Sequence, residues 1–177
     1  MGLITGSVVE RHFRITPNTG EILYRTRGGN FSPAGYIKPG TVSSGGGYRI
    51  VSVPISYRKY KKVRAHHLIW CWQYGYWPKA EIDHVNGNRD DNRISNLREA
   101  TAGQNRTNRA TQTNNKSGFK WVYRCQTEFW RADVAYRANG VKKRFRVYGQ
   151  TTPDAAYEIA SNFAKSVHGK FYNPGKK

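Results

Sequence analysis

Short runs of alternating apolar and polar residues dominate the first part of the chain. The run HFRITPNTGEILYR, residues 12–25, alternates around a Pro-Asn-Thr-Gly turn and predicts a β-hairpin. A second run, YRIVSVPI at residues 48–55, also alternates, and Pro54 favours an edge strand. Residues 1 to about 60 are therefore predicted to be rich in short strands.

The run VRAHHLIWCWQYGYWP, residues 63–78, has a different period. Its apolar residues recur at helical spacing, and Gly75 and Pro78 mark the end of the segment. The predicted apolar face consists of Ala65, Leu68, Ile69, Trp72 and Tyr76. This segment is predicted to be the packing helix of the first domain.

Residues 118–173 predict a sheet followed by a helix. The strand-like runs are FKWVYR, EFWRADVAYR and KKRFRVYG, with a hairpin turn at residues 138–140. The run TTPDAAYEIASNFAKSVHG reads as one helix, because Thr152 can cap it, Pro153 suits its first position and Gly169 ends it. We expect a three-stranded antiparallel sheet packed on one amphipathic helix.

Residues 111–117, TQTNNKS, have no large apolar side chain and predict a linker. The predicted organisation is an N-terminal domain at 1–110, the linker, and a C-terminal domain at 118–173. Mixed helices and antiparallel strands in both parts predict an α+β fold class.

The net charge of the chain indicates which class of partner it binds. The chain has 30 Lys and Arg against 11 Asp and Glu, a formal net charge of +19, and the excess extends over both halves. This favours a polyanion such as nucleic acid, with a merely solvated basic surface as the alternative. The cation-rich run YRKYKKVR, residues 57–64, can follow a phosphate backbone or form a solvent-facing strand.

No apolar run approaches the roughly 20 residues of a membrane-spanning helix, and the N-terminus lacks the features of a signal peptide. Cys71 and Cys125 lie far apart, each without a Cys or His at metal spacing. A disulfide framework and a structural zinc site are therefore not expected, and no membrane partner is expected. A reducing cytoplasm fits this pattern.

The most polar stretch is EIDHVNGNRDDNRISNLREATAGQNRTN, residues 81–108. It predicts a strand at 81–85, a loop around Gly87, a strand at 93–97, and a helix from Ala102 behind a Thr-x-x-Gln capping box. Strand, loop, strand and helix can bring Asp83 and His84 close to Asn105. The alternative is an asparagine-rich loop with an incidental histidine.

This stretch resembles the ββα-metal motif of the HNH endonuclease family. It is most similar to the phage and intron-homing branch, in which Asn replaces the last His, and the resemblance covers about residues 48–109. It implies that His84 is the general base, that Asp83 and Asn105 hold a single divalent metal ion, and that Asn96 tethers the loop that orients His84. An all-oxygen donor set favours Mg²⁺ or Mn²⁺.

The resemblance also implies hydrolysis of phosphodiester bonds to 5′-phosphate and 3′-hydroxyl ends. Arginines around the motif are candidate phosphate contacts, although solvation explains each almost as well. These arginines are Arg93, Arg98, Arg106 and Arg109. His66 falls where the branch often has a histidine, and packing or a phosphate contact is favoured there over metal ligation.

Residues 117–173 resemble the plant ethylene-response-factor DNA-binding domain. The matching stretches are SGFK, FWRA, TPDAA and HGKF, whereas Trp121 and residues 147–149 depart from that family. The resemblance implies a sheet in the major groove, with phosphate contact alone as the alternative. The outward cations would be Lys120, Arg124, Arg131, Arg144 and Arg146.

Together these features predict a metal-dependent, site-recognising endonuclease acting on double-stranded DNA, in the host-cell cytoplasm if a phage encodes it. The alternatives are an inactive DNA-binding regulator and an RNA-directed protein. The sequence leaves open the target site, nicking or double-strand cleavage, the oligomeric state, protein partners, the biological role, and which basic residues read bases.

Overall fold

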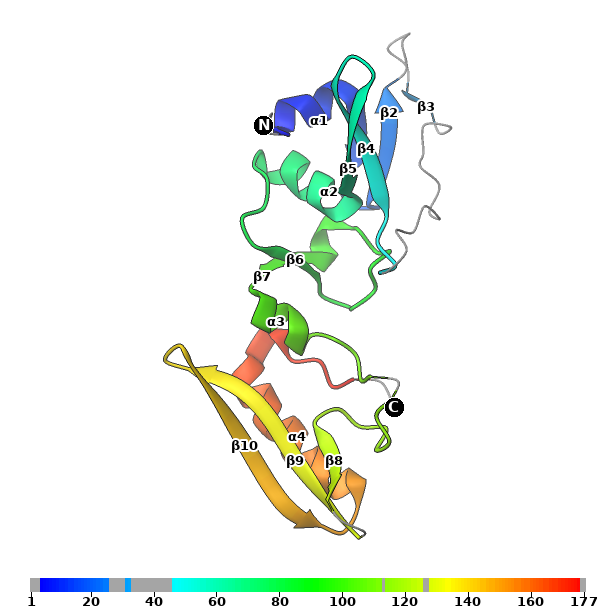
Figure 1. Cartoon of the computed structure of the whole chain (residues 1–177). Helices are drawn as coiled ribbons and strands as arrows, with labels where there is room; N and C mark the ends of the chain where they lie inside the picture. Colours follow the sequence, from blue (N-terminus) through cyan, green and yellow to red (C-terminus); the bar gives the residue numbers. More distant parts are fainter. Residues whose placement is uncertain (1–3, 26–30, 33–45, 113, 126–127, 176–177) are drawn as a thin grey trace. The chain divides into compact units, whose positions relative to one another are not determined.

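A computed structural model describes residues 4–25, 31–32, 46–112, 114–125 and 128–175 (Figure 1). The chain divides into two compact units, Met1–Ala102 and Gly103–Lys177. Each unit combines helices with small antiparallel sheets, so the predicted α+β class is confirmed. The predicted bounds of 1–110, 111–117 and 118–173 stay a prediction, and residue 113 of the linker lies outside the described residues.

The first unit begins with a helix that the sequence did not predict, α1 (Gly6–His12). Its residues GSVVERH include one glycine and two valines, which are weak helix formers, and Thr5 makes no side-chain cap bond within the helix. The helix instead contributes Val9, which is fully buried in the core. Tertiary burial therefore overrides a poor local propensity.

Three small sheets follow in the described residues of this unit. β1 (Phe13–Thr16), β2 (Glu21–Arg25) and β3 (Phe31–Ser32) form one sheet, and β1 and β2 are the hairpin predicted for residues 12–25. β4 (Ile50–Ser56) pairs with β5 (Lys59–Arg64), and β6 (Glu81–His84) pairs with β7 (Leu97–Ala100). Each of the last two sheets has two strands, so Pro54 lies on an edge, as predicted.

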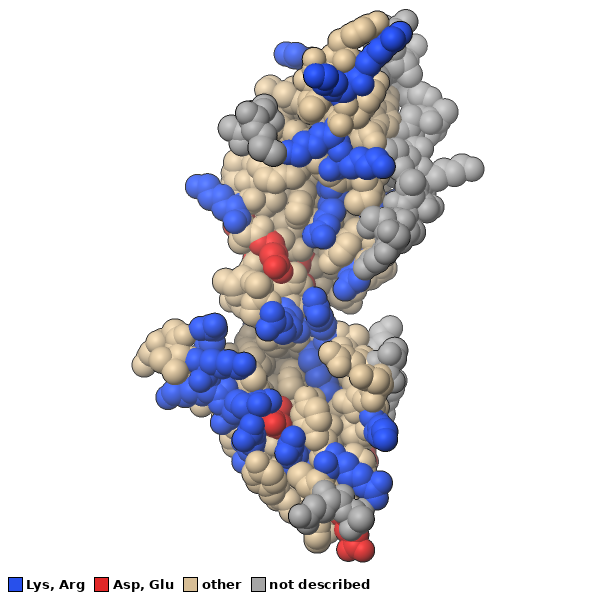
Figure 2. All heavy atoms as spheres, viewed as in Figure 1, with Lys and Arg blue, Asp and Glu red and all other residues tan. Residues whose placement is uncertain are grey.

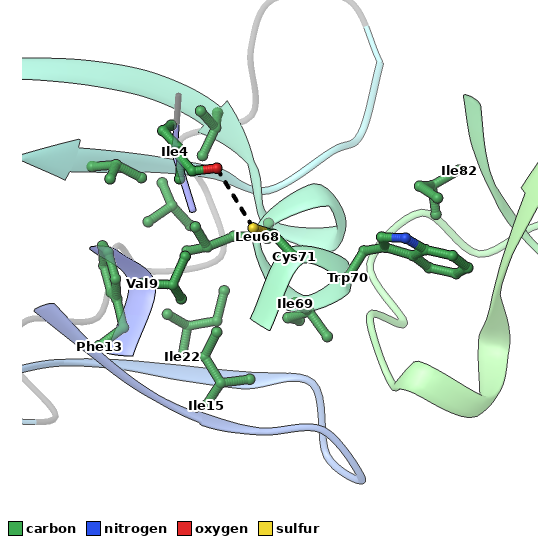
Figure 3. Packing of buried hydrophobic residues seen from close by; sticks show 14 of the residues in the cluster. Ile4, Val9, Phe13, Ile15, Ile22, Leu68, Ile69, Trp70, Cys71 and Ile82 are labelled. Atoms are coloured by element: carbon green, nitrogen blue, oxygen red, sulfur yellow. Dashed lines mark hydrogen bonds between the residues drawn. The ribbon is translucent and has the colours of Figure 1, made fainter. Parts of the chain in front are cut away.

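Helix α2 (Ala65–Tyr74) is the centre of the core of the first unit (Figure 3). Leu68, Ile69 and Cys71 are fully buried, and Gly75 ends the helix in the left-handed conformation at φ 76°. The predicted apolar face was wrong at Tyr76, which lies beyond the helix and is exposed, whereas Trp72 is partly buried and packs against the core. Trp70 takes a buried position that the periodicity did not assign.

The second unit contains β8 (Val122–Cys125), β9 (Phe129–Ala138) and β10 (Val141–Gln150), in the order β10-β9-β8. Asn139 and Gly140 both have positive φ, the geometry of a tight hairpin turn. Helix α4 (Pro153–His168) packs on this sheet, and the Thr152 hydroxyl accepts a hydrogen bond from the Ala155 N–H at 3.2 Å. The predicted sheet-plus-helix fold is confirmed.

Small side chains let α4 approach its sheet closely. Ala156, Ala160 and Ala164 are fully buried on the helix and face a sheet that buries Ala132 and Val134. None of the helices in the described parts of the chain is long and apolar enough to cross a membrane.

Candidate active site

The backbone of the site is the β6–β7 hairpin and the long loop between its strands. His84 pairs with Leu97 and Asp83 pairs with Arg98, so the Asp83 and Arg98 side chains share one face. The strand predicted at 93–97 was wrong, because residues Ile94–Asn96 form one 3₁₀ turn and β7 begins at Leu97. The helix predicted from Ala102 is α3 (Ala102–Thr107).

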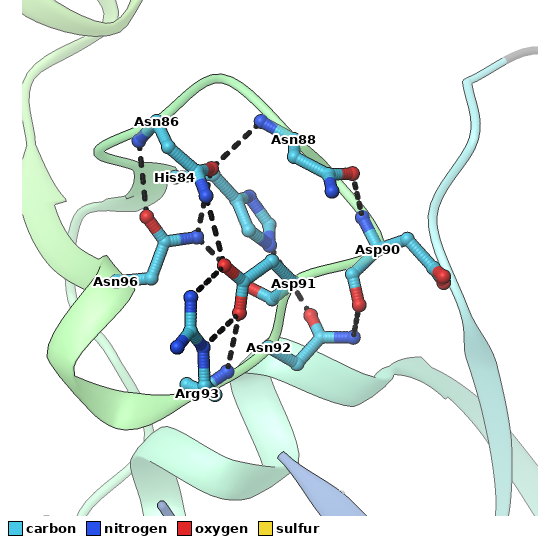
Figure 4. Close-up of polar contacts among 8 residues, drawn as sticks. All are labelled: His84, Asn86, Asn88, Asp90, Asp91, Asn92, Arg93 and Asn96. Atoms are coloured by element: carbon cyan, nitrogen blue, oxygen red, sulfur yellow. Dashed lines mark hydrogen bonds and ion pairs between the residues drawn. The ribbon is translucent and has the colours of Figure 1, made fainter. Parts of the chain in front are cut away.

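Asn96 ties this loop together (Figure 4). Its Oδ1 accepts a hydrogen bond from the Asn86 N–H at 3.0 Å, and its Nδ2 donates to Asn86 Oδ1 at 3.0 Å and to the Asp91 carbonyl at 2.7 Å. The side chain is buried, so each of these bonds satisfies a polar group that water does not reach. These are the contacts that a loop-tethering residue requires.

His84 is buried, and its Nε2 lies 3.2 Å from Oδ1 of the buried Asn92. Asn92 Nδ2 donates to the Asp90 carbonyl at 3.3 Å, which turns Oδ1 toward the imidazole. Asn92 Oδ1 can accept a hydrogen bond from His84 Nε2 in the tautomer that carries its proton on Nε2. No sequence pattern singled out Asn92, since Asn is an ordinary turn residue.

The electrostatic surroundings keep His84 a neutral base. Burial lowers the pKa of His84, and Arg89 acts in the same direction. The hydrogen bond to Asn92 and the Asp83 carboxylate oppose this shift without reversing it. An imidazole that is neutral near pH 7 can accept a proton from water.

The Asp83 carboxylate is also buried, with 4% of the side chain exposed. Arg98 donates to Asp83 Oδ2 from Nε at 2.8 Å and from Nη2 at 2.7 Å. Arg98, predicted to contact phosphate, is thus held on a carboxylate of the site and is itself 14% exposed.

The residues fit a hard divalent cation by the chemistry of their donors. Asp83 offers a buried carboxylate and Asn105 an amide oxygen, the ligand types that Mg²⁺ and Mn²⁺ prefer. Asn105 lies on α3, in the part of that helix that belongs to the second unit. Within the described residues there is no group of three or more His, Cys, Asp or Glu that could hold a metal. Metal binding by Asp83 and Asn105 stays a prediction.

The other arginines around the motif differ in their partners. Arg93 donates to Asp91 from Nε at 2.8 Å and from Nη2 at 2.7 Å, and this bond lowers the pKa of Asp91 to about 2. Arg106 and Arg109 are exposed. Phosphate contact by these arginines stays a prediction.

His66 lies in a cluster of aromatic rings beside His84. Its ring centroid is 4.5 Å from that of His67, 4.9 Å from that of His84 and 5.1 Å from that of Tyr48. The side chain is 1% exposed, and neither ring nitrogen has a hydrogen-bond partner within the described residues. Burial lowers the pKa of His66 to about 2, so it stays neutral, and packing is the role that this burial fits.

The outer face of the C-terminal sheet carries arginines gathered around one acid, Asp133. Arg144 Nε lies 3.0 Å from Asp133 Oδ1, Arg146 Nε lies 3.2 Å from Oδ2, and Arg131 Nη2 lies 4.0 Å from Oδ2. The Asp133 side chain is 2% exposed, whereas those of Arg144 and Arg146 are about half exposed. The sequence did not single out Asp133, which orients these cations.

Two of the predicted outward cations lie elsewhere. Lys120 precedes β8 in a turn, and its Nζ donates to the carbonyls of Thr107 and Asn173, the latter at 2.9 Å. Burial lowers the pKa of Lys120 to about 8. Arg124 pairs with Trp130 on the face that packs against α4, and its guanidinium lies 5.9 Å from the centre of that ring. The expectation that both point outward from a strand was wrong, because Lys120 precedes the strand, which begins at Val122, and Arg124 is on the face of the strand that packs against α4.

Comparison with known proteins agrees with this geometry. Residues 63–107 match the HNH endonuclease family, and this segment spans α2, β6, the loop, β7 and α3. The chain is 36% identical to Protein 3.8 of Escherichia phage T7 over 94 residues, which cover 51% of this chain and 76% of that protein. No solved structure matches the chain. The chain belongs to the HNH endonuclease family.

Proposed function

We propose that this protein is a metal-dependent, site-recognising endonuclease that hydrolyses double-stranded DNA. The observation that carries the proposal is the buried, neutral His84, held by Asn92 beside the Asp83 carboxylate inside the matched segment. The net charge of +19 supports a polyanionic substrate. Figure 2 shows groups of Lys and Arg side chains distributed over the drawn face, with few Asp and Glu among them.

His84 would take a proton from the attacking water, and Asn92 and Asn96 would keep the ring and its loop in place. Asp83 and Asn105 would hold one Mg²⁺ or Mn²⁺. When bound, such an ion stabilises negative charge on the phosphate and on the departing 3′ oxygen. The products would carry 5′-phosphate and 3′-hydroxyl ends.

The C-terminal unit would place the nuclease on its site, as an ethylene-response-factor-like sheet would do. The support is the outer face of the sheet, where Arg144 and Arg146 stay half exposed while Asp133 orients them. Guanidinium groups fixed in this way suit bidentate contacts to guanine better than flexible surface cations do.

The test is cleavage of supercoiled plasmids that carry sequences selected from a random library by binding to the full chain. The expected result is conversion to open-circle or linear DNA with Mg²⁺ or Mn²⁺ and none with EDTA. Religation of the ends by DNA ligase without prior phosphorylation would verify the end chemistry.

Tight binding to the selected DNA without cleavage in any metal would overturn the proposal in favour of a binding protein. Preferential cleavage of a structured RNA competitor would overturn the choice of DNA.

A further inference from the structure

Tyr48 carries two arginines on its ring next to the candidate active site. The guanidinium carbon of Arg64 lies 4.7 Å from the centre of the Tyr48 ring, and that of Arg89 lies 4.9 Å from it. The same ring centre is 6.0 Å from that of His84. Cation–π contacts therefore hold two positive charges beside the candidate general base.

Among the described residues these two arginines have no acidic partner, in contrast to three other arginines near the site. Within the part of the chain that the structure describes, Arg49, Arg93 and Arg98 form ion pairs with acidic side chains, whereas Arg64 and Arg89 form none. Arg89 donates from Nη1 to the Gly46 carbonyl at 2.7 Å, which fixes its direction but leaves its charge unneutralised. Both side chains are exposed, so an anion can reach them.

The charge extends along the β4–β5 hairpin. Val51, Val53 and Val63 fill the buried face of the hairpin. Alternation then puts Tyr60, Lys62 and Arg64 together on the opposite face, where all three are exposed. At a rise of about 3.3 Å per residue this row is about 13 Å long, which is about four nucleotides of one strand at ~3.4 Å each.

We propose that Tyr48, Arg64 and Arg89 form a phosphate-binding subsite for the DNA strand beside the bond to be cut, and that Lys62 and Tyr60 continue it along the hairpin. The proposal rests on the proposed function and adds the surface that the substrate strand follows to His84. Tyr48 acts as a positioning residue, since its ring holds both guanidinium groups. A phosphodiester backbone is the occupant that regularly spaced, unneutralised cations fit.

Binding of a fluorescent duplex, measured by anisotropy over a series of salt concentrations, tests the subsite without requiring cleavage. The variants are Arg64→Gln and Arg89→Gln, and the matched control is Arg11→Gln, which removes one exposed charge from α1 of the same unit. Each subsite variant should bind about tenfold more weakly, and the slope of log K against log salt should fall by about one. Arg11→Gln should stay within about twofold of wild type.

Substitutions of Tyr48 test whether DNA binding requires the ring to hold the two guanidinium groups in place or requires only their positive charge. Tyr48→Phe keeps the ring and should bind as wild type does, whereas Tyr48→Leu should lose about as much affinity as one arginine variant. If the proposed function is wrong, the wild-type protein will bind DNA without cutting it. The binding measurements on the variants will still show whether the subsite exists. Equal losses for Arg11→Gln, Arg64→Gln and Arg89→Gln, or no loss in any of them, would overturn the subsite.

Discussion

The imidazole of His84 and the side-chain amide of Asn92 meet at 3.2 Å, Nε2 to Oδ1, in the buried part of the β6–β7 loop. The contact joins residues only eight positions apart, yet it requires the loop to fold back across the strand end. It fixes the orientation of the imidazole and favours the tautomer that carries its proton on Nε2.

Asn92→Ala removes this contact and should lower kcat about 10- to 100-fold, because the ring can then rotate and change tautomer. KM for DNA should change little, since Asn92 is buried. Single-turnover cleavage at saturating DNA measures the effect. Asn88→Ala is the matched control, because Asn88 is an exposed asparagine of the same loop. A wild-type rate for Asn92→Ala would remove it from the site.

Arg98→Ala leaves the buried Asp83 carboxylate without its main cation. The free energy of unfolding should fall by about 3 kcal/mol, because breaking a buried pair strands a charge. The same variant should bind Mn²⁺ more tightly, since the carboxylate no longer carries an arginine. Urea unfolding with and without Mn²⁺ measures both effects.

Arg93→Ala is the control for Arg98→Ala. In its pair with Asp91, 53% of the Arg93 side chain is accessible, against 14% of the Arg98 side chain in the pair with Asp83, so the free energy of unfolding should change much less. Equal destabilisation by the two substitutions, or unchanged Mn²⁺ affinity in Arg98→Ala, would contradict the role assigned to the Asp83–Arg98 pair.

Asp133→Asn should have opposite effects on two kinds of DNA. Removing the carboxylate adds one net positive charge, so affinity for random duplex should rise and depend more steeply on salt. Discrimination in favour of a selected site should fall, because Arg144 and Arg146 lose the group that orients them. Competition binding between the selected site and random duplex measures both effects. Unchanged discrimination between the two duplexes would indicate that the sheet contacts phosphates alone.

The sequence predicted those parts of the molecule whose local pattern and tertiary packing agree. Helix α4 has a cap, a suitable first turn and a regular apolar stripe, and it was predicted with its sheet. Helix α1 was missed because its seven residues depend on burying Val9 and not on propensity. Trp70 was missed because a helix between several elements is buried on more than one face.

The site residues were also predicted where a local sequence pattern indicated them and missed where tertiary contacts determine their position. Asp83 and His84 were found because they adjoin a recognisable strand and motif, and their catalytic roles stay predictions. The sequence did not single out Asn92 or Asp133. The contact of Asn92 with His84 depends on how the loop closes, and the contact of Asp133 with Arg144 depends on the register of the strands. Lys120 was misplaced because its ammonium bonds two backbone carbonyls from distant parts of its unit, which no periodicity encodes.

His66 should make the first unit sensitive to acid. Burial holds its pKa at about 2, whereas an unfolded histidine titrates near 6.5. Below pH 6.5 the unfolded chain binds a proton that the folded chain does not, so stability is lost as pH falls, by up to about 1.4 kcal/mol per pH unit. His67, His84 and Arg64 surround this ring and oppose its protonation.

His66→Phe keeps a ring in the cluster and removes the titration. The fall in unfolding free energy between about pH 6 and about pH 4 should therefore be shallower than in wild type. Urea unfolding at a series of pH values measures this slope. Identical slopes for both proteins would mean that His66 is protonated in the folded chain.

The most direct test of the account is single-turnover cleavage of a selected site in Mn²⁺ by His84→Ala. His168→Ala is the control, because it removes a half-buried histidine from the second unit. We expect His84→Ala to bind DNA as wild type does but to cut it about 10²- to 10⁴-fold more slowly, while His168→Ala cuts at nearly the wild-type rate. Cleavage by His84→Ala within about twofold of wild type would contradict a nuclease built on His84.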